Sequence, residues 1–264
     1  MKETYIVGNW KLNPVTQHEA VTLARAVARE AAKRKLAEGV HIVLCPPLPY
    51  LAEVAKAASR LELGAQDVFY QEAGAYTGAV SAAMVADLGC QYVIVGHSER
   101  RRIFGDTNET VNKKLKAVLK SGMRPILAIG EERRDSFDER GTFTGELDPA
   151  LKDQLVEALA GISAAKVSTM IIAYEPVWAI GTGHAAKPDD VLSVRIFIKK
   201  ILRGLYSTSV ANNVPVLYGG STDSKNAGSF LQEADVNGLL VGGASLKAGE
   251  FAKMAEVASR LLAA

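Results

Sequence analysis

The sequence predicts an α/β protein built as a single (β/α)₈ barrel, with eight parallel strands ringed by helices. Eight short apolar runs alternate with helical patterns from one end of the chain to the other. The runs are continuously apolar, as expected for parallel strands that are buried on both faces. No linker or change of composition divides the 264 residues. A closed barrel is therefore favoured over an open sheet, and we expect residues 1–264 to form one barrel domain.

The eight predicted strands are rich in Leu and β-branched residues and cover residues 5–8, 40–45, 61–65, 92–95, 125–129, 170–174, 214–217 and 238–241. Apolar residues spaced three to four apart predict helices, the clearest of which are 17–37, 107–120 and 188–206. Thr107 followed by Thr110 is a helix-start signal. The polar segment 131–149 predicts a long surface loop, with a helix beginning at Asp148-Pro149.

Composition excludes several classes of function. Lys and Arg number 31 against 29 Asp and Glu, and this near-balance gives no reason to expect nucleic acid or an anionic membrane as partner. Cys45 and Cys90 lie in apolar runs outside any Cys/His cluster, so we expect reduced buried thiols and no metal. No secretory signal and no apolar run of membrane-spanning length is visible. The expected location is the cytoplasm.

Polar residues that follow the apolar runs are the candidates for chemistry, because active sites in such barrels lie at the carboxyl ends of the strands. Lys11 follows the first run, His97 the fourth and Glu175 the sixth, while glycine pairs follow the seventh and eighth. Each alone could have an ordinary structural role, such as a surface charge, a hydrogen-bonded histidine or a strand exit. The barrel places all of them at one face, which makes those separate structural roles less plausible together.

The glycine turns indicate a phosphate site. Gly242-Gly243 precedes a helix start at Ala244, whose backbone N–H groups would face an anion. Phosphate sites in barrels frequently use the loops after strands 7 and 8. The apolar segment 176–186 carries two glycines and predicts a lid over the substrate. Its Gly181-x-Gly183-x-x-Ala186 pattern resembles a dinucleotide fingerprint, but the strand–turn–helix context is missing, so we expect no NAD and no other cofactor.

These segments together resemble the triosephosphate isomerase family over essentially the whole chain, in the same order. The resemblance is carried by Gly8-Asn9-Trp10-Lys11, Val95-Gly96-His97-Ser98-Glu99-Arg100-Arg101, Ala173-Tyr174-Glu175-Pro176-Val177-Trp178-Ala179-Ile180-Gly181-Thr182-Gly183, Tyr218-Gly219-Gly220-Ser221 and Gly242-Gly243-Ala244-Ser245-Leu246. In this family, the tuning of side-chain pKa values and the closure of a lid are well-known examples in enzymology. The resemblance implies interconversion of dihydroxyacetone phosphate and D-glyceraldehyde 3-phosphate in glycolysis and gluconeogenesis, without a metal or cofactor.

By this resemblance, Glu175 is the base that moves a proton between two carbons through an enediolate. His97 is the electrophile and acts as a neutral imidazole at a helix start. Asn9 and Lys11 bind substrate and stabilise the oxyanion, and Glu99 orients Lys11 or relays protons. The expected phosphate ligands are Asn9, Lys11, Gly181, Ser221, Gly242 and Gly243. The expected lid comprises Pro176, Val177, Trp178, Ala179, Ile180, Gly181, Thr182, Gly183, His184, Ala185 and Ala186.

The stretch around Gln66 and residues 74–78 resembles the family's interface loop, whose tip enters a neighbouring subunit. We therefore expect a homodimer with Thr77, Tyr76 and Arg100 at its interface, and with Thr77 supporting Lys11 or Glu99 of the partner. Ala79 replaces an acidic residue that is frequent in this loop, so one partner of Arg100 is expected to be missing.

Other departures leave the catalytic groups in place. Ala128 replaces a cysteine usual after the fifth strand, the lid ends His184-Ala185-Ala186, the loop 133–147 is long, and Thr222-Asp223 is unusual after the phosphate serine. These departures leave room for an isomerase of tetrose (erythrulose) phosphates with the same mechanism. A Schiff-base aldolase that uses Lys11, and a barrel retained only for binding, are the alternatives from other classes.

Overall fold

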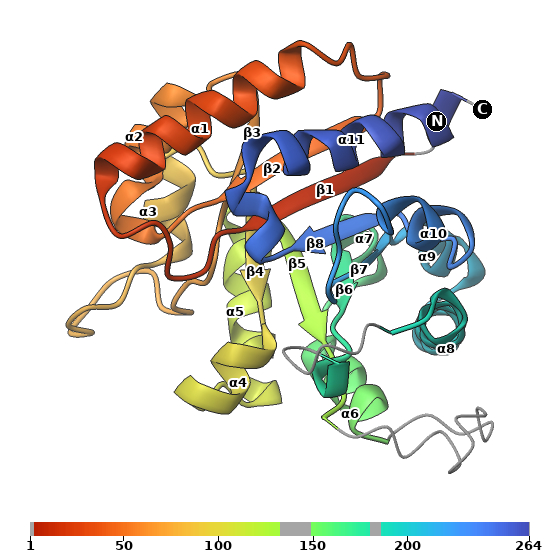
Figure 1. The fold of residues 1–264 in the computed structure, drawn as a ribbon. Helices are drawn as coiled ribbons and strands as arrows, with labels where there is room; N and C mark the ends of the chain where they lie inside the picture. Colours follow the sequence, from red (N-terminus) through yellow and green to blue (C-terminus); the bar gives the residue numbers. More distant parts are fainter. Residues whose placement is uncertain (1–2, 133–148, 180–185, 264) are drawn as a thin grey trace.

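The strands of the chain form a closed parallel barrel in sequence order (Figure 1). The computed structural model describes residues 3–132, 149–179 and 186–263. The strands are β1 (Thr4–Asn9), β2 (Val40–Cys45), β3 (Glu62–Ala65), β4 (Tyr92–Val95), β5 (Arg124–Ile129), β6 (Ile171–Tyr174), β7 (Val216–Tyr218) and β8 (Gly238–Val241). Pairing of β1 with both β2 and β8 closes the barrel. The predicted fold class is confirmed.

Helices ring the strands on the outside (Figure 1). They are α1 (Gln17–Ala32), α2 (Leu51–Ala57), α3 (Ala82–Asp87), α4 (Ser98–Phe104), α5 (Asn108–Lys120), α6 (Pro149–Ala158), α7 (Ala164–Val167), α8 (Pro188–Leu205), α9 (Thr208–Asn213), α10 (Ala227–Gln232) and α11 (Ala248–Ala263). In the described parts of the chain, three short 3-10 helices follow strands, namely η1 (Leu48–Tyr50), η2 (Val177–Ala179) and η3 (Gly243–Leu246). The last helix, α11, packs beside α1, which brings the two ends of the chain's helical ring together.

Most element bounds agree with the predictions to within one residue, and two predictions need correction. The seventh strand was expected at 214–217 but covers Val216–Tyr218, because Val214 is the C-terminal cap of α9. The first helix was expected to reach residue 37 but ends at Ala32. Lys35 has a left-handed φ of 43°, which a continuing α-helix does not allow. The predicted helix start at Thr107 is confirmed, since its side chain accepts the N–H of Thr110.

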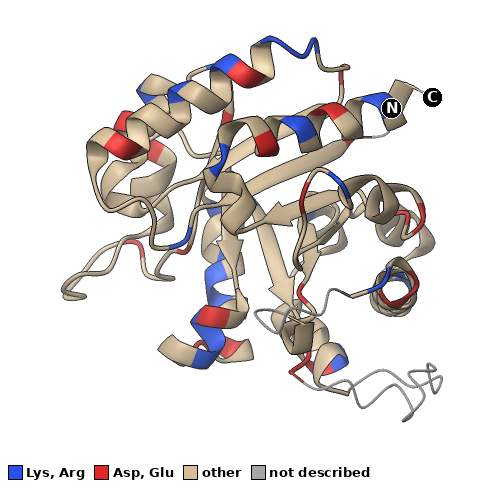
Figure 2. Cartoon of the chain, in the orientation of Figure 1, with Lys and Arg blue, Asp and Glu red and all other residues tan. Residues whose placement is uncertain are grey.

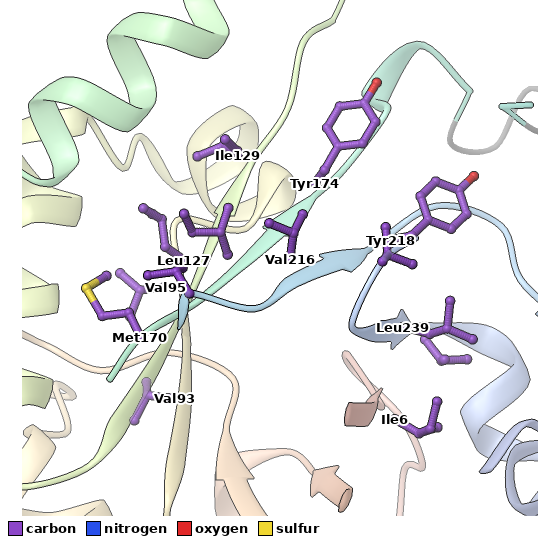
Figure 3. Close-up of a cluster of buried hydrophobic side chains, with 14 of the residues drawn as sticks. Ile6, Val93, Val95, Leu127, Ile129, Met170, Tyr174, Val216, Tyr218 and Leu239 are labelled. Atoms are coloured by element: carbon purple, nitrogen blue, oxygen red, sulfur yellow. The ribbon is translucent and has the colours of Figure 1, made fainter. Parts of the chain in front are cut away.

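Two apolar layers hold the barrel together. One fills its interior with alternate strand residues, among them Val7, Val43 and Ile94. The other lies between the outer strand faces and the helices; Figure 3 shows part of it, with Val95, Leu127 and Val216 labelled. Both cysteines are buried and free, as expected.

Charged residues lie mainly outside these layers. Figure 2 shows acidic and basic residues interspersed along the helices, whereas β1 and β8 carry none. Within the described residues, none of the helices has both the length and the apolar character needed to cross a membrane.

A polar network closes the amino end of the barrel. The His41 ring stacks on Tyr5 at 4.7 Å, and its Nδ1 lies 3.1 Å from both carboxylate oxygens of Glu62. Tyr5 in turn hydrogen-bonds Glu3 and the guanidinium of Arg124. The hydrogen bond to Glu62 raises the pKa of His41 against the opposing effect of burial. Charged side chains therefore help to hold the amino end of the barrel together. The predicted active site lies at the opposite, carboxyl end.

Candidate active site at the carboxyl ends of the strands

A cavity of about 300 Å³ opens at the carboxyl ends of the strands. It is lined by Asn9, Lys11, His97, Glu175, Gly219, Gly220, Ser221, Thr222, Leu240, Gly242, Gly243 and Ala244. Seven of the nine predicted catalytic and phosphate-binding residues therefore meet at one place, although they lie at the ends of β1, β4, β6, β7 and β8, while Glu99 is not part of this lining. Gly181 and lid residues 180–185 lie outside the described residues.

Lys11 enters the cavity from a strained backbone. Its φ is +54°, a conformation that is uncommon for residues other than glycine. Two side chains hold this turn, because Asn9 Oδ1 accepts the Lys11 N–H at 3.1 Å and Gln66 Nε2 donates to the Lys11 carbonyl at 2.9 Å. Strained residues of this kind concentrate at functional sites. The turn places the Lys11 side chain in the lining of the cavity.

The Lys11 ammonium pairs with Glu99 of α4 at 2.7 Å. Partial burial raises the pKa of Glu99, but the hydrogen bond and charge of Lys11 outweigh burial and leave that pKa below its ordinary value. The carboxylate is thus ionised and fixes the lysine. This arrangement suits charge stabilisation better than attack by a free amine, which disfavours the Schiff-base alternative.

His97 is the N-cap residue of α4, and this position determines which of its nitrogens carries a proton. Its Nδ1 accepts the backbone N–H of Glu99 at 3.2 Å. A nitrogen that accepts a hydrogen bond is unprotonated, so the neutral ring carries its proton on Nε2. Nε2 lies 2.8 Å from Oε1 of Glu175. The helix start therefore holds Nδ1 of the ring and turns Nε2 toward the carboxylate.

Glu175 is almost completely buried and follows β6 directly. Its Oε2 accepts the N–H of Ser98 at 2.8 Å, while Oε1 faces the ring of His97. One helix terminus thus supplies both neighbours of the carboxylate. A buried carboxylate needs hydrogen-bond donors, and the Ser98 N–H and the His97 ring lie in position to provide them. The Glu175 side chain still lines the cavity.

The glycine turn after β8 begins the short helix η3. Its geometry is fixed by Ser245, whose N–H and hydroxyl both donate to the Gly242 carbonyl, at 2.9 and 2.6 Å. The first N–H groups of a helix have no partner inside it. Gly242 and Gly243 line the cavity, so this turn offers backbone donors to an anion there.

Sequence reasoning missed a hydrogen-bonded cluster at the start of the predicted lid. Glu131 is buried, and its Oε1 accepts from Tyr174 Oη at 2.6 Å and from Trp178 Nε1 at 2.7 Å. Burial and the nearby carboxylate raise the pKa of Tyr174 well above its ordinary value. The cluster ties η2 to the ends of β5 and β6. An available signal was the position of Glu131, two residues beyond a buried strand.

A second cavity, of about 740 Å³, adjoins the first and shares Asn9, Lys11 and His97 with it. Its rim carries exposed apolar side chains, including Leu12, Ile103 and Phe104. Thr77 and Tyr76 are exposed on the loop between β3 and α3.

Arg100 has acidic partners on its own chain, although Ala79 supplies none. Arg100 lies on the wall of the second cavity, with Nε 3.1 Å from Asp67 and 3.6 Å from Asp106. These two aspartates also bind the buried ammonium of Lys114. Asp67 and Asp106 therefore pair with both Arg100 and Lys114, and the absence of one further partner at position 79 stays a prediction.

No group of three His, Cys, Asp or Glu side chains is placed to hold a metal in the described parts of the chain. The polar groups of the cavity include one carboxylate, one imidazole, one ammonium, the Asn9 amide, two hydroxyl groups and backbone N–H groups. Such a set can move a proton, stabilise a negative oxygen and bind a phosphate.

Comparisons with known proteins agree with this chemistry. The sequence model described as triosephosphate isomerase matches residues 4–258. A protein named triosephosphate isomerase from Alkaliphilus oremlandii is 42% identical over 95% of this chain and 98% of its own length. Proteins of the same name from Dehalococcoides mccartyi and Citrifermentans bemidjiense are 42% and 43% identical, over 98% and 96% of this chain and 98% of each relative.

Proposed function

Because the chain belongs to the triosephosphate isomerase family, we propose that Glu175, His97 and Lys11 act on a triose phosphate bound in the 300 Å³ cavity. The chain is an isomerase that interconverts dihydroxyacetone phosphate and D-glyceraldehyde 3-phosphate. The observation that carries the residue assignment is the 2.8 Å approach of His97 Nε2 to Glu175 Oε1 beside the Lys11 ammonium. The names of the relatives speak for trioses, so the tetrose alternative is not favoured.

In the proposed reaction, the Glu175 carboxylate removes a proton from the carbon beside the substrate carbonyl. Electrons of the broken C–H bond form the enediolate C=C bond, and the carbonyl oxygen becomes negative. His97 Nε2–H and the Lys11 ammonium stabilise that oxygen. A proton then passes, through His97 Nε2, from the hydroxyl oxygen on the first carbon to the negative oxygen on its neighbour. The carboxylic acid of Glu175 finally returns its proton to the neighbouring carbon, and the oxygen left negative on the first carbon becomes the new carbonyl oxygen. Substrate must first take over the Nε2–H that Glu175 accepts in the free enzyme.

The remaining groups hold the substrate. Backbone N–H groups at Ser221, Gly242 and Gly243 bind the phosphate, and Asn9 supports both the Lys11 turn and the oxyanion. Glu99 keeps the Lys11 ammonium in place. Residues 176–186 form a lid, with Gly181 as a further phosphate donor, and closure keeps water from the enediolate.

We further propose a homodimer in which the partner's Thr77 loop fills the 740 Å³ cavity. Leu12 is 90% exposed and Phe104 63% exposed. In an isolated subunit these large apolar side chains would stay in contact with water, which is unfavourable. A segment placed in that cavity would contact Lys11 and Glu99, which line its wall. Tyr76 and Arg100 lie where such an interface would form. Sedimentation tests this proposal, because a fully active monomer would overturn it.

The proposed role fits a cytoplasmic glycolytic and gluconeogenic enzyme made of one barrel domain. The deciding experiment compares kcat/KM for both triose phosphates in the wild type, in Glu175→Gln and in Glu157→Gln. Glu157 lies on α6, outside the cavity lining, and serves as the matched control. Removing the general base is expected to lower kcat/KM by roughly 10²–10⁴-fold, while the control keeps wild-type values. A Glu175→Gln enzyme of normal activity would refute the assigned base.

A further inference from the structure

Within the described residues, the side chain of Thr222 makes no hydrogen bond to the other residues that line the cavity. Thr222 lines the cavity directly after Ser221, beside Lys11, Gly242 and Gly243. Its hydroxyl oxygen is buried, yet it has no hydrogen-bond partner within the described parts of the chain. A buried hydroxyl without a partner loses its hydration and gains nothing in return. A valine would fill the same volume without that loss.

The backbone around Thr222 is held from both sides. The side-chain amide of Asn226 donates to the Ser221 carbonyl at 3.3 Å and accepts the Asp223 N–H at 2.9 Å. The Asp223 carboxylate in turn accepts the N–H groups of Lys225 and Asn226, at 2.8 and 3.0 Å. The two peptide groups that flank Thr222 are therefore fixed before any ligand arrives. Only the rotation about its Cα–Cβ bond remains open.

We propose that the Thr222 hydroxyl is an additional phosphate donor that finds its partner only when substrate is bound. Phosphate oxygens are strong acceptors, and a hydroxyl donates one hydrogen bond in whichever direction its rotamer allows. Rotation between staggered positions about the Cα–Cβ bond turns the hydroxyl toward the ligand without moving the fixed backbone. This inference rests on the proposed function and adds one side-chain donor to its backbone phosphate site.

The test measures binding of inorganic phosphate by titration calorimetry at constant ionic strength, together with KM for the triose phosphates. Thr222→Val keeps the shape of the side chain and removes the donor, and Thr222→Ser keeps the donor. Thr222→Val is expected to weaken phosphate binding and raise KM by about tenfold, as for loss of a hydrogen bond to a charged group. Thr222→Ser should stay within about threefold of the wild type, because it retains that bond.

Thr169→Val supplies the matched control. Thr169 lies in an exposed turn before β6, where its hydroxyl donates to the Lys166 carbonyl, and it is absent from the cavity lining. The control should bind phosphate as the wild type does. Thermal unfolding adds a second readout, because loss of an unpartnered buried hydroxyl should leave the Tm of Thr222→Val unchanged or higher.

Wild-type phosphate affinity in Thr222→Val would overturn the inference and leave the proposed isomerase intact. If the wild type itself neither bound phosphate nor isomerised trioses, the proposed function would fail, and the inference with it. Equal tenfold losses in Thr222→Val and Thr222→Ser would also overturn the inference, since they would indicate packing and not hydrogen bonding.

Discussion

Substitution of Gly130 by alanine tests how strictly the barrel positions the proposed base. Gly130 follows β5, and a Cβ added there would lie 2.0 Å from the carbonyl oxygen of Glu175. Real Cβ atoms essentially never approach closer than 3.0 Å, so the two backbones must separate by at least 1.0 Å (3.0 − 2.0). Gln154 holds the Gly130 peptide by bonds of 3.0 and 2.9 Å to its N–H and carbonyl groups. The displacement therefore falls largely on Glu175.

A misplacement of about 1 Å can cost roughly 10²-fold in rate, and we expect Gly130→Ala to lower kcat/KM by about that factor. Inorganic phosphate should bind normally, because its proposed donors at Gly242 and Gly243 follow β8 and are not in contact with Gly130. The matched control is Gly204→Ala in α8, where an added Cβ meets nothing within 4 Å. The test is to compare kcat/KM of Gly130→Ala, Gly204→Ala and the wild type by steady-state kinetics with both triose phosphates. A folded Gly130→Ala protein with wild-type kcat/KM would refute the reasoning.

Two further predictions concern stability. The pKa of His41 is raised above 6.5, so its stabilising charge is fully present below about pH 6.5 and is lost as pH rises through the folded-state pKa. His41→Gln should therefore lower the free energy of unfolding in urea more at acidic than at alkaline pH, whereas exposed His18→Gln should show no such difference; equal losses at both would contradict this. Lys114→Met leaves two aspartates without their buried cation and should cost about 3–5 kcal/mol in urea unfolding. Lys113→Met removes an exposed ion pair with Glu109 and a contact of the ammonium with the Tyr70 ring, and should cost about 1 kcal/mol or less, so similar losses in both variants would count against the argument.

The sequence sufficed for the fold because barrel strands are buried on both faces. Continuous apolar runs such as those of β4 and β8, repeated between helical patterns, are typical of parallel strands covered by helices. The carboxyl-end rule then brought Lys11, His97 and Glu175 to one face before any distance was known. The ends of elements were less predictable, since they depend on single backbone conformations such as the positive φ of Lys35.

Contacts between distant segments were beyond sequence reasoning. The pairing of Arg100 with Asp67 joins α4 to the segment after β3, and no local pattern announces it. The bonds from Trp178 and Tyr174 to Glu131 likewise depend on how η2 lies against two strand ends. Such contacts follow from packing in three dimensions, whereas periodicity reports only which face of an element is buried.

Substitutions at the strained turn of Lys11 are expected to affect stability and activity differently. A left-handed conformation costs a non-glycine residue roughly 1–2 kcal/mol, and alanine keeps that cost while glycine removes it. The partly exposed pairing with Glu99 is worth about 1 kcal/mol or less, and both Lys11→Ala and Lys11→Gly lose it equally. Lys11→Gly should therefore be more stable than Lys11→Ala by about 1 kcal/mol or less, after the greater chain entropy of glycine is subtracted.

Both Lys11 variants should lose activity to the same extent, because both lack the ammonium. Urea unfolding and kcat/KM measured on the same preparations compare the two quantities directly. A Lys11→Ala protein at least as stable as Lys11→Gly would mean that the turn carries no strain for the bonds of Asn9 and Gln66 to offset. If Lys11→Gly is the more stable variant, as expected, the backbone strain at Lys11 lowers the stability of the protein while it holds one positive charge at the mouth of the barrel.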